Sequence, residues 1–359
     1  MKTQVLCLFG GKSSEYKVSL RSACTVLASL DSEKYDVRAV GITEAGRWYL
    51  YTGEHARIAD DTWHTDAANL RRAMLPSSFG EGCLYVEAEA GGRFDTYPVD
   101  VVIPVVHGAY CEDGTLQGLL SMTGIPYVGP HTAASAISMD KAYTKLVLAN
   151  FGIPQARCVV LTRARVEADA SGAIAEAEGV SAYPLFVKPA NAGSSVGVSR
   201  ADNREALRAA LALAAIHDDK ILVEECIVGR EVECAVLGNT APEAAVPGEI
   251  CSGAEFYDYD AKYVNDTSSD YIPARISEAA REAVRAYAVQ IYEILGCRGL
   301  SRVDFFVTED ERIVFNEINT LPGFTSISMY PKLWNAMGVT TPQLLDRLIA
   351  LALSDDAGK

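Results

Sequence analysis

The sequence has little positive charge and no cysteine pattern suited to a metal site or a disulfide framework. Its 32 Lys and Arg residues face 47 Asp and Glu residues, which gives a formal net charge of -15. Nucleic acid and anionic membranes would repel such a protein, so we expect neither as a partner. The 9 cysteines include no CxxC pair, which is typical of reduced thiols in a cytoplasmic protein.

Long apolar runs, internal repeats and low-complexity linkers are also missing. No apolar stretch approaches the roughly 18 residues that a membrane span needs. Strand-like QVLCLFGG follows the start almost at once, so we expect no signal peptide and a cytoplasmic location. The nucleotide-binding signature GxGxxG and the Walker pattern are absent as well, which weakens the case for a nicotinamide cofactor or a P-loop.

A chain of 359 residues exceeds what one hydrophobic core usually organises, so we expect several lobes. Over residues 1–129, short apolar strands alternate with amphipathic helices, which is typical of a doubly wound α/β lobe. We interpret the polar stretch from Trp48 to Gly92 as an irregular insertion in that lobe. Two further lobes are expected over residues 130–228 and 229–359, with a cleft between them.

The stretch YPLFVKPANAGSSVGVSR predicts a phosphate site. Lys188 ends an apolar strand, and a turn with Gly193, Ser194, Ser195 and Gly197 follows it. Glycine lets the backbone approach a ligand closely, amides and hydroxyls can line an anion site, and the lysine supplies a point charge. A plain β-hairpin is the alternative interpretation.

A second constellation lies in LSRVDFFVTEDERIVFNEINTLPGFTS. Alternation places Arg302 and Asp304 on one face of a strand, and Glu317 and Asn319 on one face of the next. With a two-residue loop at 310–311, Asp304 would pair with Glu317, and Arg302 with Asn319. Mg²⁺ prefers hard oxygen ligands and commonly bridges to phosphates, whereas close carboxylates repel one another without a cation. This pattern predicts a magnesium site; an exposed edge hairpin with solvated charges is the alternative.

Two single residues are weaker candidates. Glu15 lies in the first turn of the helix expected after GGKSS, where an acid usually stabilises the helix start but could also meet a ligand ammonium group. His107 follows the apolar strand VDVVIPVV, at the kind of strand end where α/β clefts bind ligands; a hydrogen-bonded loop histidine is the commoner role. The aromatic and acidic loop EFYDYDAKYVND is interpreted as a lid or a packing loop.

Seven motifs span nearly the whole chain in a fixed order: GGKSSEYKVSL, HGAYCEDGTLQG, SMDKAYTK, KPANAGSSVGVS, EFYDYDAKY, SRVDFF and FNEINTLPGFTSISMYP. Together they resemble the D-alanine:D-alanine ligase family of the ATP-grasp superfamily. The resemblance implies an ATP-grasp fold of three lobes, an N-terminal α/β lobe and two α+β lobes that enclose ATP. It also implies ligation of two D-alanines through a D-alanyl phosphate for peptidoglycan precursors, and a homodimer.

For ATP, the resemblance implies phosphate contacts from two lysines, an adenine segment at 224–227 and a ribose contact from one glutamate. The implied ATP-binding residues are Lys141, Lys188, Ser195, Glu224, Glu225, Ile227, Glu231, Phe256 and Lys262. Two Mg²⁺ ions, for which Mn²⁺ can substitute, are implied on Asp304, Glu317 and Asn319.

For the two amino acids, the resemblance implies that Glu15 orients the first ammonium group through Ser194 and Tyr263. Arg302 and the backbone amide of Gly323 would form an oxyanion site. The implied catalytic residues are Glu15, Ser194, Tyr263, Arg302 and Gly323. The implied substrate-binding residues are Glu15, Val18, His107, Arg302, Gly323, Ser328 and Met329.

The sequence departs from the family pattern in AYCEDG. Cys111 stands where the family usually has glycine, and Ala109 and Tyr110 are also unusual, so the bulkier loop puts the role of His107 in doubt. A relative that binds nucleotide without ligation, as a regulatory or scaffolding module, is the alternative from another class.

The second substrate is the main alternative within the family. The resemblance implies that ligases making a D-lactate ester lack the lid tyrosine, here Tyr263, and that D-serine ligases tend to carry arginine at the position of Met329. Methionine offers no strong donor to a serine hydroxyl, so we expect D-alanine in the second site and keep D-alanine:D-serine ligation as the alternative.

Overall fold

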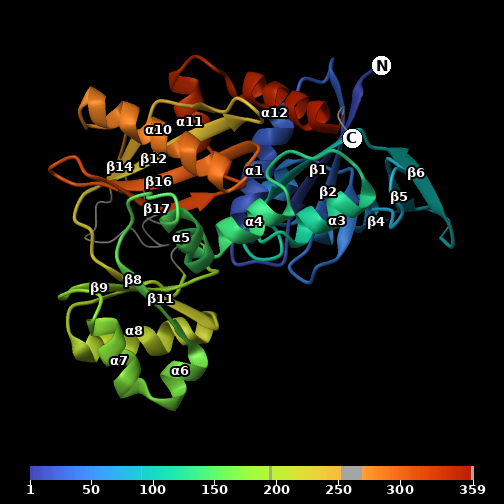
Figure 1. Cartoon of the computed structure of the whole chain (residues 1–359). Helices are drawn as coiled ribbons and strands as arrows, with labels where there is room; N and C mark the ends of the chain where they lie inside the picture. The colour runs from blue at the N-terminus through green and yellow to red at the C-terminus, as the bar shows by residue number, and fades with distance from the viewer. Residues whose placement is uncertain (90, 194–195, 252–268, 357–359) are drawn as a thin grey trace.

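In the computed structural model, residues 1–89, 91–193, 196–251 and 269–356 are described. Three sheets, each from its own stretch of chain, make up the fold (Figure 1). The mixed α/β architecture agrees with the predicted fold class. In the described part of the chain, no helix combines the length and apolar character needed to span a membrane.

The first sheet has the order β6-β5-β4-β3-β2-β1-β7. Only its end around β1 is parallel, because β1 pairs in parallel with both β2 and β7. Its strands are β1 (Thr3–Gly10), β2 (Tyr35–Ile42), β3 (Trp48–Tyr51), β4 (Leu70–Met74), β5 (Cys83–Glu87), β6 (Phe94–Pro98) and β7 (Val101–Val106). The helices of this stretch are α1 (Tyr16–Ser29), α2 (Ala56–Ala59), η1 (Trp63–Thr65), η2 (Ala67–Asn69) and α3 (Thr115–Thr123).

The interpretation of Trp48–Gly92 as an irregular insertion is wrong. This stretch forms β3, β4 and β5, which continue the first sheet as an antiparallel meander. Its polar residues misled the sequence reading because antiparallel strands can keep one face in water. Trp63 between β3 and β4 is fully buried, so the stretch also contributes to the core.

The second sheet, β10-β9-β11-β8, is antiparallel and has a core of its own. Its strands are β8 (Cys158–Thr162), β9 (Leu185–Pro189), β10 (Ser199–Ala201) and β11 (Lys220–Glu225). Helices α6 (Arg163–Ala168), α7 (Ala170–Glu178) and α8 (Arg204–His217) cover one face, at the lower left of Figure 1. Leu207 and Leu211 of α8 join Val187 and Val223 in the core, as expected for the apolar stripe of an amphipathic helix.

The third sheet runs β15-β14-β12-β16-β17, with β13 paired to β12. Its strands are β12 (Arg230–Gly238), β13 (Glu243–Ala244), β14 (Gly248–Cys251), β15 (Ser269–Tyr271), β16 (Gly299–Val307) and β17 (Ile313–Asn319). Around it lie α4 (Thr132–Met139), α5 (Lys141–Ala149), α10 (Glu278–Ile294), α11 (Met329–Ala336) and α12 (Thr341–Asp356).

Alternation along β12 separates a packing face from a cleft face. Val232, Cys234 and Val236 share a core with α10, α4 and α5. Glu231 and Glu233 point the other way, because successive side chains of a strand alternate between its faces. The apolar face thus fixes the strand and leaves its acidic face toward the cleft.

The predicted pairing of the acidic hairpin is confirmed. Asp304 lies opposite Glu317, and Arg302 lies opposite Asn319. The predicted two-residue loop is wrong, because β16 and β17 are joined by residues 308–312. A register shift, with Asn316 as the extra residue of β17, compensates for the longer loop and restores the pairing at the site.

Trp63 ties the segment between β3 and β4 to the first sheet. Its ring packs edge-on against Phe9 with 4.9 Å between ring centroids, and its Nε1 donates to Tyr16 Oη at 3.0 Å. A Cβ on Gly41 would lie 2.3 Å from this ring. Tyr16 follows Glu15, so this packing also supports the start of α1.

Trp63→Ala is expected to lower the free energy of unfolding by about 3 to 5 kcal/mol, because it leaves a large cavity in the core. Urea unfolding measures the change. His55→Ala, at an exposed position of the same segment, should stay within about 0.5 kcal/mol of wild type. Equal effects of the two substitutions would contradict this account of the segment.

Candidate active site

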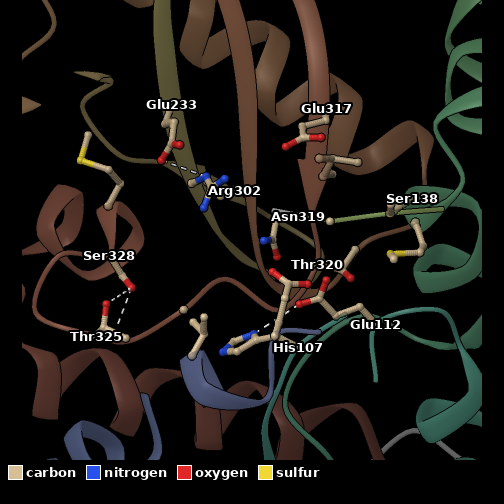
Figure 2. A pocket seen from close by; sticks show the side chains of 18 of the residues that line it. His107, Glu112, Ser138, Glu233, Arg302, Glu317, Asn319, Thr320, Thr325 and Ser328 are labelled. Carbon is tan, nitrogen blue, oxygen red and sulfur yellow. Dashed lines mark hydrogen bonds and ion pairs between the residues drawn. The ribbon is translucent and has the colours of Figure 1, made fainter. Parts of the chain in front are cut away.

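Two adjoining cavities lie beside the cleft face of the third sheet. The smaller has a volume of about 130 Å³ and is shown in Figure 2. The larger, about 570 Å³, lies between the second and third sheets. Their shared wall includes Lys141, Glu233 and Glu317. A group bound in one cavity can therefore meet a group bound in the other.

The smaller cavity gathers predicted residues that lie far apart in the sequence. Its lining includes Glu15, Val18, His107, Arg302, Glu317, Asn319, Gly323, Ser328 and Met329. Ser194 and Tyr263 lie outside the described residues. The structure thus brings together all the predicted substrate-binding residues, from the first and third sheets and from the turn before α11.

The larger cavity gathers most of the residues predicted for ATP. Its lining includes Lys141, Lys188, Glu224, Glu225, Ile227, Glu231, Asp304 and Glu317. Ser195, Phe256 and Lys262 lie outside the described residues. Phe186, Phe305, Phe306 and Phe315 also line this cavity, and Lys141 lies on the wall that it shares with the smaller cavity.

Glu224 is buried between two lysines. Its carboxylate lies 2.6 Å from Lys188 Nζ and 2.6 Å from Lys145 Nζ. Burial opposes its ionisation, but the two lysines outweigh burial and lower the pKa of Glu224 to about 2. Burial also opposes the charge on Lys188, and Glu224 raises its pKa in spite of that. Both groups are therefore charged at neutral pH.

Lys141 stands at the first position of α5, on the shared wall. Asp140 caps this helix by accepting hydrogen bonds from the amides of Ala142 and Tyr143. This cap fixes where the helix begins and so positions Lys141. The Lys141 ammonium donates to Ala192 O at 2.9 Å and lies 3.3 Å from Glu317 Oε2. It thus connects the glycine and serine loop with the acidic hairpin.

Arg302 is held by carboxylates from two strands. Its Nε and Nη2 donate to the two oxygens of Asp304 at 2.8 and 2.7 Å. Its Nε also lies 2.9 Å from Glu233 Oε2, an ion pair visible in Figure 2. Burial works against the charge, but Asp304 and Glu233 raise the pKa of Arg302. A permanent positive charge therefore faces the smaller cavity.

The donor set beside Arg302 fits a magnesium ion that also binds phosphate. Asp304 and Glu317 lie directly opposite each other and line the larger cavity, and Asn319 follows on the same strand. Within residues 1–89, 91–193, 196–251 and 269–356, no group of three His, Cys, Asp or Glu forms a complete metal cluster. Magnesium commonly takes one or two carboxylates and completes its shell with waters and phosphate oxygens, so this pair is sufficient.

Glu15 precedes α1 and reaches two glycine turns. A Cβ on Gly193 would lie 2.6 Å from Glu15 Oε2, and a Cβ on Gly108 would lie 2.8 Å from it. The side chain of Glu15 does not cap its helix. The carboxylate of Glu15 lies at the smaller cavity, against the loop that starts at Gly193. This position supports the interpretation that Glu15 meets a ligand ammonium group.

His107 remains in the smaller cavity in spite of the unusual loop after it. The left-handed positions just after His107 are Gly108 and Tyr110, at φ 75° and 64°, whereas Cys111 is buried and has no positive φ. His107 Nδ1 lies 2.9 Å from Leu321 O and 3.3 Å from Glu112 Oε1. The side chain at Cys111 has therefore not moved the histidine out of the site.

A turn before α11 closes the far side of the smaller cavity. Ser328 Oγ accepts from the amide of Thr325 at 3.0 Å and lies 2.8 Å from Thr325 Oγ1 (Figure 2). A Cβ on Gly323 would lie 2.8 Å from Ser328 Oγ, so glycine is needed for this close approach. Met329 follows, buried, with its methyl group against Gly248.

The polar residues at the site that were missed from the sequence include Lys145, Glu112, Glu233 and Asn316. For two of them a signal existed. Lys145 lies four residues after Lys141 on the same helix face, and Glu233 lies two residues after Glu231 on the same strand face. No periodicity marks Glu112, and Asn316 enters only through the β-bulge.

Chemically, the arrangement suits transfer of a phosphoryl group to an anion. Lysines and a carboxylate pair face the larger cavity, where a polyphosphate and its cation would be neutralised. Arg302 and a glutamate face the smaller one, where they match a carboxylate and an ammonium group. The shared wall is where the two substrates would react.

The sequence matches two protein-family models. Residues 4–130 match the model described as D-ala D-ala ligase N-terminus, and residues 147–350 match D-ala D-ala ligase C-terminus. The chain is 46% identical to the D-alanine–D-alanine ligase of Acetivibrio thermocellus over 364 residues, which cover 98% of this chain and 96% of the relative. It is 48% identical to the D-alanine–D-alanine ligase of Ruminiclostridium cellulolyticum, with 98% and 95% covered.

Solved structures of similar ligases also match nearly the whole chain. The VanG D-Ala:D-Ser ligase from Enterococcus faecalis superposes with a TM-score of 0.88 at 41% identity, over 98% of this chain and 100% of that one. The D-alanine-D-alanine ligase from Coxiella burnetii superposes with a TM-score of 0.84 at 33% identity, over 99% and 95%.

Glu112→Gln is expected to change how stability depends on pH. Burial, with a smaller contribution from Glu15, raises the pKa of Glu112 from 4.5 to about 7 although His107 opposes the shift. Between these values the folded chain keeps a proton that the unfolded chain has released. This carboxyl therefore makes the free energy of unfolding fall as pH rises through that window.

Urea unfolding of wild type and Glu112→Gln at about pH 5 and about pH 8 checks this sign. The stability of wild type relative to the variant should be lower at the higher pH. If the stability of wild type relative to the variant is equal at both pH values, or is higher at the higher pH, the pKa of Glu112 is not raised in the folded protein.

Proposed function

The chain belongs to the D-alanine–D-alanine ligase family, and from that premise we propose that its two cavities divide the reaction between them. ATP occupies the larger cavity and the two amino acids occupy the smaller. The shared wall of Lys141, Glu233 and Glu317 carries this proposal, because it lets a phosphate in one cavity face a carboxylate in the other.

The enzyme joins two D-alanines into D-alanyl-D-alanine, forming a carbon–nitrogen bond for peptidoglycan precursors. A carboxylate is a poor electrophile because its leaving group would be oxide. The first D-alanine therefore takes the γ-phosphoryl group of ATP, and the amine of the second attacks the resulting acyl phosphate and releases phosphate. Positioning and charge neutralisation supply most of the acceleration in such transfers.

The lining of the larger cavity supports the following proposed ATP contacts. Lys188 and Lys141 neutralise phosphate oxygens, the segment 224–227 follows the adenine, and Glu231 meets the ribose. Their places along the cavity support this order, since both lysines lie toward the acidic hairpin. Ser195, Phe256 and Lys262, outside the described residues, complete the proposed set.

Asp304, Glu317 and Asn319 would hold Mg²⁺, two ions in this proposal, with Mn²⁺ as a substitute. A cation held there would supply positive charge against the negative charge that develops on the phosphate during transfer. The oxygen donors of these side chains and the direct pairing of Asp304 with Glu317 support the assignment.

In the smaller cavity, Glu15 receives the ammonium group of the first D-alanine, with Ser194 and Tyr263 in the same hydrogen-bonded chain. Arg302 and the amide of Gly323 stabilise the oxyanion that forms when the second amine attacks. Val18 and His107 line the pocket. The loop EFYDYDAKYVND, interpreted above as a lid or a packing loop, lies outside the described residues.

Ser328 is proposed to bind the carboxylate of the second substrate, next to Met329. A D-Ala:D-Ser ligase is among the similar structures, so the second substrate needs a test of its own. The Met329 side chain is buried and apolar, which supports D-alanine because methionine gives a serine hydroxyl no hydrogen-bond donor at this position.

Three features complete the proposal. The lobes extend over 1–129, 130–228 and 229–359, and the N-terminal family model, which ends at residue 130, supports the first boundary. The enzyme acts in the cytoplasm, where its substrates are made. It assembles as a homodimer, as the resemblance implies.

Glu317→Gln is expected to abolish turnover at limiting Mg²⁺ while the enzyme stays folded, because one anionic ligand of the cation is lost. Thermal unfolding checks that the variant is folded. Phosphate release with added D-alanine measures the effect. Glu243→Gln, at an exposed position of β13, should keep wild-type rates. A Glu317→Gln enzyme with near wild-type turnover at limiting Mg²⁺ would exclude the metal assignment.

A competition assay is expected to show D-alanine as the second substrate. With D-alanine and D-serine at equal concentration, D-alanyl-D-alanine should be the main product when the dipeptides are separated by mass. Met329→Arg should raise the share of D-alanyl-D-serine, because arginine adds hydrogen-bond donors at this position. A majority of D-alanyl-D-serine from the wild-type enzyme would overturn the assignment.

A further inference from the structure

Three carboxylates lie in one row across the third sheet. Asp304 on β16 is opposite Glu233 on β12 and also opposite Glu317 on β17. Arg302 lies two residues before Asp304 on β16 and therefore points to the same face. Figure 2 shows its ion pair with Glu233. Glu233 thus lies beside the proposed metal ligands, on the strand that flanks them.

Asp304 contacts Arg302 and is also a proposed ligand of the cation, and these two interactions compete. Both of its oxygens accept hydrogen bonds from Arg302, at 2.8 and 2.7 Å. A divalent cation on Asp304 needs at least one of these oxygens, and its positive charge repels the guanidinium. A cation on Asp304 therefore competes with Arg302 and weakens this bidentate contact.

The guanidinium needs another anionic partner when that contact opens. Its side chain is only 16% exposed, and leaving a buried charge without compensation is costly. Glu233 Oε2 is already 2.9 Å from Arg302 Nε, and the Glu233 side chain is itself only 11% exposed.

We infer that Glu233 is a positioning residue that keeps Arg302 in place when Asp304 turns to the cation. The inference rests on the proposed metal site at Asp304 and Glu317. With Glu233 present, the row contains enough negative charge to satisfy both Arg302 and the cation. Without it, Arg302 stays on Asp304, and the cation has to displace it.

The geometry also explains why the length of the side chain matters. Glu233 reaches Arg302 from a neighbouring strand, and aspartate at this position is one methylene shorter. The Glu233→Asp side chain keeps the charge but ends short of Nε. Comparing the two acids therefore separates a positioning contact from a general effect of negative charge on cation affinity.

Binding of Mn²⁺ to the enzyme with a non-hydrolysable ATP analogue, measured by electron paramagnetic resonance of free Mn²⁺, tests the inference without turnover. Glu233→Gln and Glu233→Asp should each bind Mn²⁺ about tenfold more weakly than wild type, in the range found when a residue that orients a metal ligand is lost. Glu243→Gln should bind like wild type. Thermal unfolding identifies any variant that does not fold.

Two results would overturn the inference: Mn²⁺ affinity of Glu233→Gln within about twofold of wild type, or full wild-type affinity of Glu233→Asp. Asp304→Asn distinguishes failure of the underlying proposal. If Asp304→Asn binds Mn²⁺ as wild type does, the proposed metal site is wrong. If Asp304→Asn weakens binding and Glu233→Gln does not, only the role of Glu233 is wrong.

Discussion

The pairing of β16 with β17 is the constraint on which the site depends. Near the loop the strands pair with Phe305 opposite Phe315, and the register then shifts by one residue at Asn316. Without that shift, Asn316 would lie opposite Asp304, and Glu317 would lie opposite Val303 on the apolar face. Because side chains alternate, a slip of one residue moves every following side chain to the other face. One bulge residue therefore decides whether Glu317 and Asn319 face the cleft or the core.

Charge compensation is the second principle of the cleft. Lys188 is paired with Glu224, Lys141 with Glu317, and Arg302 with Asp304 and Glu233. These cations are largely buried, so their carboxylate partners keep them charged and in place before substrates arrive. Phosphates and a divalent cation then enter a site whose charges are already positioned, which reduces the reorganisation needed during the reaction.

Motifs and alternation predicted the site better than they predicted its supporting structure. The pairing of Asp304 with Glu317 follows from period two, and the resemblance supplied Glu15, which folding brings against Gly193. The bulge at Asn316 was not predicted. The assumed two-residue loop at 310–311 gives the correct pairing of Asp304 with Glu317 without a bulge, whereas the actual loop at 308–312 needs one. The strands within Trp48–Gly92 were missed because their polarity is that of a half-exposed antiparallel sheet.

The central claim is that the acidic hairpin binds the cation of the ATP complex, and anomalous diffraction tests it directly. Crystals grown with Mn²⁺ and a non-hydrolysable ATP analogue should show an anomalous peak in contact with both Asp304 and Glu317, with the guanidinium of Arg302 on Glu233. A peak bound away from these two carboxylates, with Arg302 still bidentate on Asp304, would contradict the account.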